Sequence, residues 1–292
     1  MLIKSANFST AALDRFREYQ RLSFSILEQM AGSLQPGMTE KEVARALVCR
    51  FKEYGVNSFF HLPVVLFGER TALPGEWRLS NFFPKSRALQ VDDSVILDAA
   101  PLFDGYLVDT SYSFCFGESP VHRKMMADLA HFRSDIRTAV NNGKTFKSIA
   151  DNVNRELLEQ GYQPVHTKHP GEVLGHRALK TINLPFAWRL QGFDAMSLSW
   201  FISKSKMGDL GLRTSPLWNN KKSSNHPPQD GLWLVEPHAG AGVTGAKWEE
   251  ILVIQNGQAE WLDQEPPHLQ QWASIARNRG YGPRALHVKN PV

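Results

Sequence analysis

The sequence predicts an α+β fold in which helices cover a mostly antiparallel sheet. Apolar residues recur at helical spacing near the N-terminus and again after residue 120. Short β-branched runs separated by turn residues occupy the middle and the end of the chain. Because these strand-like runs are joined largely by hairpins, an α+β fold is favoured over a doubly wound parallel sheet. The 292 residues, 42% of them hydrophobic, are enough for one large domain.

The N-terminal part predicts two helices. Residues 10–35 carry the first apolar pattern, and Pro36-Gly37 ends it. Thr39 and Glu42 have the spacing of a capping box, which predicts a second helix that begins there and runs to about residue 54.

The middle of the chain predicts a strand, an irregular segment and a hairpin. Residues 58–67 have the composition of a strand, and residues 68–90 are rich in Gly, Pro, Arg and Asn. Two apolar, β-branched runs then follow within residues 94–116. Pro101 and Asp104-Gly105 separate these runs and predict the turn.

The second half predicts helices first and strands later. Ser119 is the expected cap of a helix over 120–140, and a further helix is expected from Thr145 to about Gln160. The remaining expected elements are a polar loop at 203–229, strands at 232–235 and 251–254, and a short helix at 267–278. We expect one domain over residues 1–262, a tail over 263–292 and no separate N-terminal domain.

Two carboxylates in the predicted hairpin are the first candidates for chemistry. Asp98 and Asp109 each follow an apolar, β-branched run, so the hairpin brings both acids towards one another inside an apolar sheet. Buried carboxylates are costly unless a positive group lies between them. A metal ion is such a group, which makes a search for further ligands worthwhile.

Three more potential ligands accompany strand-like sequence. His176 follows Val-Leu-Gly, Glu236 follows Leu-Trp-Leu-Val, and Glu249 precedes Ile-Leu-Val-Ile. Taken singly, each is more typical of a structural residue. Together with the two aspartates they supply four carboxylates and one imidazole, which suit a pair of divalent ions such as Mn, Co, Fe or Zn.

The order and context of these residues resemble the pita-bread metallopeptidases, the family of methionine aminopeptidase, aminopeptidase P, prolidase and creatinase. The resemblance extends over about residues 15–262. The segments that carry it are Leu97-Asp98, Gly105-Tyr106, Asp109-Thr-Ser111, Gly175-His176, Val235-Glu236-Pro237 and Lys247-Trp248-Glu249-Glu250. It implies a curved, mostly antiparallel sheet covered by helices.

The resemblance also implies roles. Asp98 would bind one metal, Asp109 and Glu249 would bridge both metals, and His176 and Glu236 would complete the second. Glu249 is preferred to Glu250 because it stands where the first acid of the family motif stands. Glu236 would also transfer protons between water and the leaving nitrogen.

The sequence departs from the family at its helper histidines. Gly75 and Asn183 stand where those histidines are expected. Since loss of such a donor costs on the order of 10²–10³ in rate, metal binding is better supported than ordinary peptidase activity. His61, His238 and Arg177 are the candidate replacements, each weighed against a packing role.

The functional prediction is a dinuclear metal-dependent hydrolase of a peptide or small amide, of the Xaa-Pro or methionyl aminopeptidase type. The alternatives are a non-peptidase enzyme acting on a specialised small molecule on the same scaffold, or a binding protein that has lost catalysis. His166 and His169 are interpreted as loop histidines. Trp188, Trp200 and Trp218 are candidates to line a pocket.

The charge and composition of the chain limit the kinds of binding partner and the location that we expect. The net charge is +4, and the densest basic stretch, 204–222, is interpreted as a solvated loop, so we expect no nucleic-acid partner. No apolar run approaches the roughly 18–20 residues of a membrane span, and the first residues lack the pattern of a signal peptide. Two cysteines, expected to be buried thiols, fit a cytoplasmic location. The sequence is compatible with a homodimer as well as with a monomer.

Overall fold

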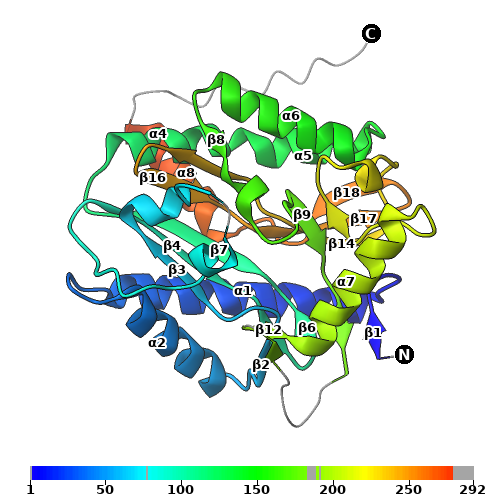
Figure 1. Ribbon diagram of the computed structural model, residues 1–292, viewed down its shortest axis with the longest axis horizontal. Helices are drawn as coiled ribbons and strands as arrows, with labels where there is room; N and C mark the ends of the chain where they lie inside the picture. The colour runs from blue at the N-terminus through cyan, green and yellow to red at the C-terminus, as the bar shows by residue number, and fades with distance from the viewer. Residues whose placement is uncertain (1, 77, 183–188, 191, 279–292) are drawn as a thin grey trace.

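The computed structural model describes residues 2–76, 78–182, 189–190 and 192–278 (Figure 1). Its α-helices are α1 (Thr10–Ser33), α2 (Glu40–Glu53), α3 (Leu79–Phe82), α4 (Pro120–Leu129), α5 (His131–Asn141), α6 (Phe146–Glu159), α7 (Ala195–Asp209) and α8 (Pro267–Asn278). The 3-10 helices are η1 (Gly68–Ala72), η2 (Val165–Lys168) and η3 (Lys222–Ser224).

The strands are short and numerous. They are β1 (Ile3–Lys4), β2 (Ser58–Phe59), β3 (Val64–Phe67), β4 (Asp93–Ala99), β5 (Pro101–Phe103), β6 (Tyr106–Leu107), β7 (Thr110–Phe116), β8 (Gln163–Pro164), β9 (Gly175–Arg177), β10 (Lys180–Thr181), β11 (Arg189–Leu190), β12 (Phe193–Asp194), β13 (Leu217–Trp218), β14 (Gly231–Val235), β15 (His238–Ala241), β16 (Thr244–Lys247), β17 (Glu250–Gln255) and β18 (Gln258–Trp261).

Local signals explain where the helices begin. The side chain of Thr39 accepts a hydrogen bond from the backbone of Glu42, whose carboxylate accepts one from the backbone of Thr39 at 2.8 Å, so the predicted capping box is confirmed. The side chains of Thr145 and Ser119 cap α6 and α4 by accepting a hydrogen bond from the backbone of Ser148 and His122, respectively.

The sheets are antiparallel in every strand pair of the described chain, as the hairpin pattern predicted. One sheet has the order β3-β4-β7, and another has the order β13-β9-β14-β17-β18. The segment between β4 and β7 forms the small hairpin β5–β6, whose turn residues Asp104 and Gly105 have φ of 47° and 81°. Two successive positive φ angles are typical of a tight hairpin turn.

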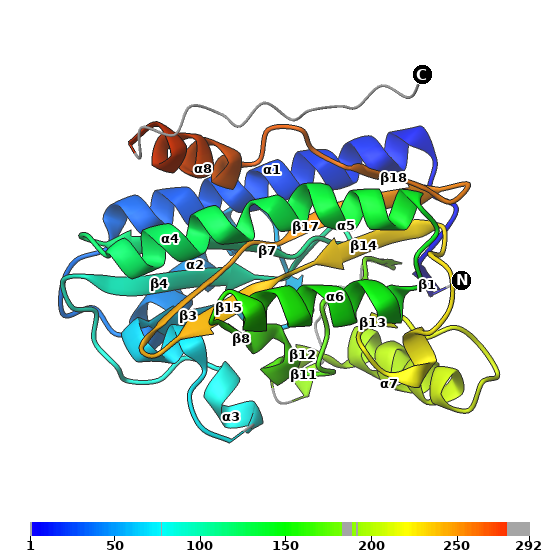
Figure 2. The same cartoon turned by 90° about the horizontal axis from the view of Figure 1, so that it is seen from above.

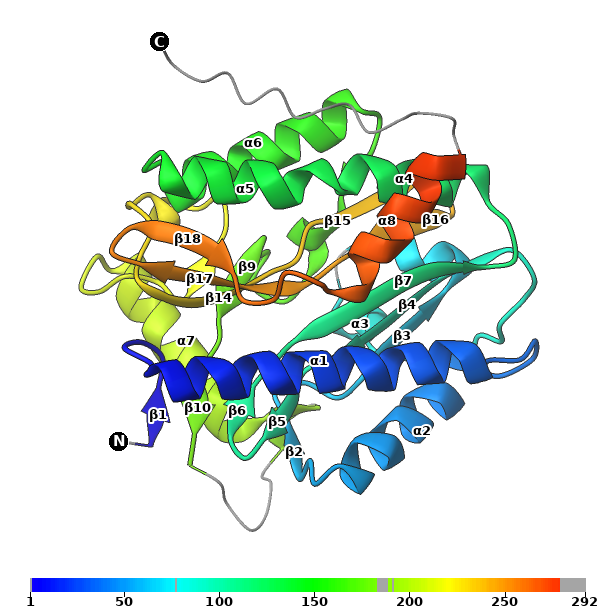
Figure 3. The same ribbon diagram turned by 180° about the vertical axis from the view of Figure 1, so that it is seen from behind.

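Helices cover the sheets from two sides. α1 packs against β4 and β7, α4 against β16, and α5 against β18. Figure 2 and Figure 3 show α1 running along one side of the strands, with α5 and α6 on another. α8 lies against α4 and adds Trp272 to the core, so residues after 262 also pack on the domain.

The central strand β14 lies between the two larger apolar cores of the described chain. Leu232 and Leu234 belong to the core beneath α1, whereas Trp233 and Val235 belong to the core beneath α5 and α6. This alternation follows from the two-residue period of a strand. The same alternation fixes which side chains of the paired strand β9 point to the α1 side of the sheet.

Several expectations about elements were wrong. The expected helix over 120–140 is two helices that adjoin at Ala130. The expected loop at 203–229 begins inside α7, because Asp194 accepts a hydrogen bond from the backbone of Ser197 and caps a helix there. Strands β15 and β16 were not predicted. Cys49 is exposed and Cys115 is partly exposed, so neither is the buried thiol that was expected.

No helix in the described parts of the chain combines the length and the apolar composition that crossing a membrane requires.

Candidate metal centre

The ladder between β4 and β7 places the two aspartates on one face. Asp98 pairs with Ser111 across the ladder. Asp109 lies two residues before Ser111, and residues two apart in a strand point to the same side. Both carboxylates are therefore directed into the interior, where they are 2% and 1% exposed.

The register of the second sheet brings three more ligands to the same place. His176 on β9 pairs with Leu234 of β14, so its ring is on the Leu234 side of the sheet. Glu236 follows β14 directly, and its backbone N–H donates to Leu174 O. Glu249 pairs with Ser111 in an isolated bridge, which joins this sheet to the ladder of the aspartates.

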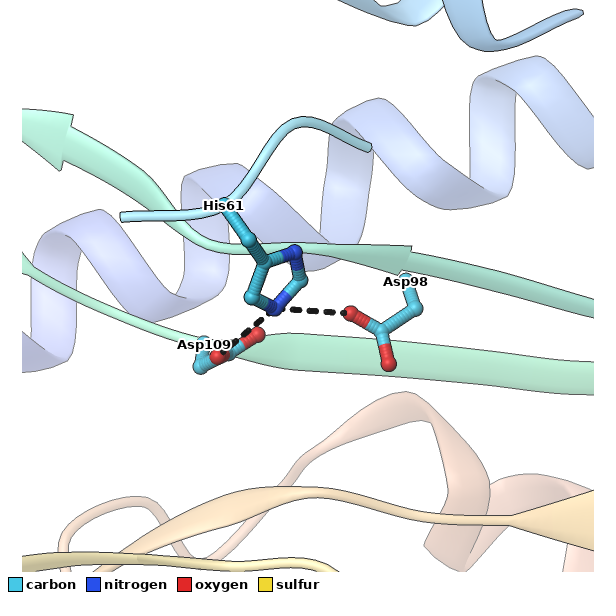
Figure 4. Close-up of side chains that lie close together, drawn as sticks. All are labelled: His61, Asp98 and Asp109. Atoms are coloured by element: carbon cyan, nitrogen blue, oxygen red, sulfur yellow. Dashed lines mark ion pairs between the residues drawn. The ribbon is translucent and has the colours of Figure 1, made fainter. Parts of the chain in front are cut away.

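Two groups of potential ligands share Asp109. One consists of His61, Asp98 and Asp109, and the other of Asp109, His176 and Glu249, with the ligand atoms of each group within 4.8 Å of one another. Figure 4 shows the ring of His61 pointing between the two aspartates, with Nε2 at 3.2 Å from Asp109 Oδ2 and 3.6 Å from Asp98 Oδ1. His176 Nε2 lies 3.7 Å from Asp109 Oδ2.

A lysine that the sequence analysis passed over lies inside this cluster. Lys247 Nζ is 2.6 Å from Asp98 Oδ2, 2.9 Å from Glu236 Oε2 and 3.0 Å from Glu249 Oε2. It is 2% exposed, and burial, which disfavours its charged form, is outweighed by Asp98, Glu236 and Glu249, so its pKa lies well above its usual value. Its ammonium therefore stays charged and balances part of the negative charge.

Lys247 leaves three carboxylate oxygens of the cluster without a partner. Asp98 Oδ1, Asp109 Oδ1 and Glu249 Oε1 are buried and accept no hydrogen bond. Such atoms are costly in the interior unless a cation binds them. Carboxylate oxygens with two imidazoles are a donor set that Mn, Fe, Co or Zn accepts. The residues present therefore fit a divalent ion.

The carboxylates respond differently to their surroundings. Burial and the neighbouring Asp109 raise the pKa of Glu249 well above its usual value. Burial also raises the pKa of Asp98. For Asp109, burial is outweighed by His61 and His176, and the pKa falls to about 2. For His61, burial is outweighed by Asp109 and Asp98, and the pKa rises to about 9.

A chain of hydrogen bonds leads away from Glu236. His169 Nδ1 lies 2.8 Å from Glu236 Oε2, His169 Nε2 lies 2.9 Å from His238 Nδ1, and His238 Nε2 lies 2.7 Å from Thr71 O. All three side chains are buried. His169 was expected to be a loop histidine without a functional role. Its position shortly before Gly175-His176 is the one feature of the sequence that points to the site.

The other predicted site residues lie elsewhere. Arg177 pairs with Trp233, so it points to the opposite face of β9, where its guanidinium lies 4.2 Å from the Trp233 ring and donates to Asp230 O. Arg177 therefore does not reach the cluster, and its expected role of binding a substrate carboxylate there is wrong. Glu250 also faces away and binds Arg133 and His268.

Of the two positions where helper histidines were expected, the structure describes only Gly75. Gly75 is exposed and has a φ of 81°, a conformation that favours glycine. Asn183 and Trp188 lie outside the described residues. Trp200 packs against Phe201, and Trp218 is buried against Phe146, so neither indole lies on the wall of the cavity described next.

A cavity of about 540 Å³ opens beside the cluster. His61, Asp98, Asp109, His169, His176 and Glu236 form its polar end. The cavity has the size of small-ligand pockets, roughly 300–1,000 Å³. A substrate in it would contact the cluster and the two imidazoles of His61 and His169.

Comparisons with known proteins agree with this arrangement. The family described as "Metallopeptidase family M24" matches residues 14–256. An uncharacterised peptidase of Staphylococcus saprophyticus is 24% identical over 168 residues, which are 57% of this chain and 46% of the relative. An uncharacterised peptidase of Staphylococcus aureus is 26% identical over 165 residues, 56% of this chain and 45% of the relative. The matched segment is thus less than half of each curated relative.

Solved structures share the fold. The X-Pro aminopeptidase of Thermotoga maritima has a TM-score of 0.64 and 17% identity over 88% of this chain and 62% of that one. The Xaa-Pro dipeptidase of Bacillus anthracis has a TM-score of 0.60 and 19% identity over 91% and 62%. At these identities the likeness shows the fold alone.

Proposed function

This chain belongs to metallopeptidase family M24, and on that premise we propose that it is a metal-dependent hydrolase of a peptide or small amide bond. The family and the pita-bread fold that the motifs predicted are thereby confirmed. The observation that carries the proposal is the buried cluster of unpartnered carboxylate oxygens at the polar end of a cavity. The proposed ligands are Asp98, Asp109, His176, Glu236 and Glu249.

We propose two divalent ions, since two ligand groups share Asp109. Bound ions of this kind supply Lewis acidity and lower the pKa of a water molecule. His61 Nε2 lies near both aspartates and is a candidate additional ligand. Manganese and cobalt are the metals we would test first.

The hydrogen-bond chain from Glu236 holds a proton at a defined place. His238 Nε2 faces a carbonyl oxygen and must donate, so its Nδ1 must accept from His169 Nε2. His169 Nδ1 then faces Glu236 Oε2 with one proton between them. Because burial is outweighed by Lys247 and His169, the pKa of Glu236 lies well below its usual value, so its carboxylate accepts the hydrogen bond from His169 Nδ1.

His169 is therefore the group from which a leaving nitrogen can receive a proton. It lines the cavity and is oriented by Glu236 and His238. In this proposal His169 does, from a new position, what a helper histidine of the family does. Glu236 keeps its predicted part in proton transfer through its contact with His169.

Two aspartates on one strand provide the test. Metal content and amide hydrolysis would be measured after reconstitution with Mn²⁺ for Asp98→Asn and for Asp93→Asn. Both residues are buried on β4, but Asp93 pairs with Arg87 away from the cluster. We expect Asp98→Asn to lose metal and at least about 10²-fold in kcat/KM, and Asp93→Asn to keep both. Wild-type protein that binds less than one equivalent of metal, or equal loss in both variants, would refute the proposal.

A non-peptidase enzyme on the same scaffold is the second candidate. Gly75 in place of a helper histidine favours it. Turnover of free dipeptides by the wild type that is lost in His169→Gln would eliminate this candidate. The two free thiols, Cys49 and Cys115, support our proposal that the enzyme works in a reducing compartment such as the cytoplasm.

A further inference from the structure

Among the described residues, the wall of the cavity that adjoins the imidazoles of its polar end is largely apolar. Phe60, Phe82, Phe193 and Phe201 line it. The ring of Phe60 lies 5.0 Å from that of Phe201 and 5.8 Å from that of Phe193, centroid to centroid. Phe82 packs against His61, whose ring also contacts Phe193. Side chains on three separate segments thus form one continuous aromatic surface. Such a wall gains free energy by removing an apolar group from water.

Helix α7 extends this wall to the mouth of the cavity. Leu198, Phe201, Ile202 and Ser205 all line it, and their spacing of three, four and seven places them on one face of the helix. Ile202 is 46% exposed. Leu190, 57% exposed, lines the same mouth. Exposed apolar side chains that surround an opening are typical of a binding site for an apolar ligand.

The lining offers little to the charged ends of a free peptide. Outside the cluster, Lys206 is the one charged residue among the described residues that form the wall. Lys247 engages three of the four carboxylates of the cluster, and all four are proposed metal ligands. A zwitterionic dipeptide would leave an ammonium or a carboxylate against the phenylalanines, and such burial is costly.

We propose that this cavity takes a large apolar group, an alkyl chain or an aromatic ring, and that the substrate is an uncharged amide carrying that group instead of a free dipeptide. The inference rests on the proposed hydrolase function for its reaction. In that reaction the oxygen of water bonds to the carbonyl carbon, the carbon–nitrogen bond breaks, and the nitrogen leaves with a proton, giving an acid and an amine.

Binding is tested without turnover. The probe is the N-octyl amide of dansyl sulfonic acid, which is neutral, carries no hydrolysable carboxamide and changes emission on entering an apolar site. We expect a blue-shifted emission that octanamide displaces and glycyl-proline does not. Absence of saturable binding, or displacement by glycyl-proline alone, would overturn the inference.

Two neighbouring substitutions on α7 locate the site. Ile202→Glu places a charge at the mouth, whereas Ser203→Glu places the same charge on an exposed residue of the same helix outside the lining. Both positions are exposed, so neither change disturbs the core. We expect Ile202→Glu to weaken probe binding at least about tenfold and Ser203→Glu to leave it unchanged. Equal effects of the two would contradict the assignment.

Turnover separates this inference from the proposed function. For the metal-loaded enzyme and a series of N-acyl p-nitroanilides from acetyl to octanoyl, we expect kcat/KM to rise up to about fourfold for each methylene buried. Probe binding without hydrolysis of any amide would support the apolar site and refute the hydrolase. Hydrolysis of dipeptides in preference to the octanoyl compound, without probe binding, would support the hydrolase and refute the apolar site.

Discussion

Lys247 sets the charge of the buried cluster before any metal binds. Its ammonium contacts one oxygen of each of three carboxylates, and the other oxygen of Asp98 and of Glu249 has no hydrogen-bond partner. The lysine therefore stabilises the folded protein without metal. A dication in the same cluster would be repelled by this ammonium.

Lys247→Met is expected to have two opposite effects. The free energy of unfolding of the metal-free protein should fall by about 3–5 kcal/mol, because buried carboxylates lose their partner. The affinity for Mn²⁺, measured by calorimetric titration, should rise at least about tenfold. Lys247→Arg keeps the charge and serves as the control. Unchanged or weaker affinity in Lys247→Met would show that the ammonium does not compete with the metal.

His122 predicts how the protein responds to acid. It is buried in α4, and burial alone lowers its pKa from 6.5 to about 4. Because the unfolded chain binds this proton more readily, the contribution of His122 to stability is complete above pH 6.5 and is lost as the pH falls towards 4. By linkage this amounts to about 3 kcal/mol at pH 4.

His122→Leu should therefore flatten the pH dependence. The free energy of unfolding, measured in urea at pH 7 and pH 4.5, should drop by about 2–3 kcal/mol less in the variant than in the wild type. His166, whose pKa burial and His169 lower to about 3, remains in both proteins and contributes equally to each. An identical drop in the two proteins would contradict this account of His122.

At the scale of elements, Gly175 fixes the distance between β9 and β14. A Cβ added there would lie 2.4 Å from Leu234 O, closer than the backbone allows. The glycine of the Gly-His motif therefore has a packing reason, since it lets β9 approach β14 and places His176 against the cluster.

Gly175→Ala should move His176 and weaken both stability and metal binding. We expect the free energy of unfolding to fall by about 1–3 kcal/mol and Mn²⁺ affinity to fall with it. Gly32→Ala in α1 is the matched control, because an added Cβ there has no neighbour within 4 Å and should stabilise by roughly 0.5–1 kcal/mol. Metal affinity equal in the two variants would show that the position of β9 does not matter.

How well the sequence predicted each element depended on how local its signal is. The cap at Thr39 and the turn at Asp104-Gly105 involve neighbouring residues, and both were found. The end of α7, from residue 203 onward, was taken for a loop because the basic stretch that starts there also contains Pro, Asn, Gly and Ser. The cap at Asp194 was not noticed in the sequence. β15 and β16 carry Gly and Ala in place of a β-branched pattern, so they gave no strand signal.

Only those site residues that lie in recognisable sequence motifs could be assigned a role from the sequence. The five ligand candidates lie within or next to strand-like sequence and could be named from it. Lys247 and His169 could not, because their contacts with Glu236 depend on how β16 and η2 fold back over the cavity. The opposite orientation of Arg177 follows from a register of β9 with β14 that the sequence does not specify.

At the scale of the whole molecule, the cluster lies where two sheets meet. Asp98 and Asp109 come from the β3-β4-β7 sheet, and His176 comes from the sheet that contains β14. The bridge between Ser111 and Glu249 joins the two. A metal bound here would cross-link both halves and stabilise the fold in proportion to its free concentration.

The most direct test is anomalous X-ray diffraction at the manganese edge from crystals grown with Mn²⁺. The proposal predicts anomalous peaks within coordination distance of Asp109 and Glu249, next to His176 and Asp98. An anomalous map with no peak near these four side chains, with Lys247 still bound to its three carboxylates, would contradict the metal-dependent function.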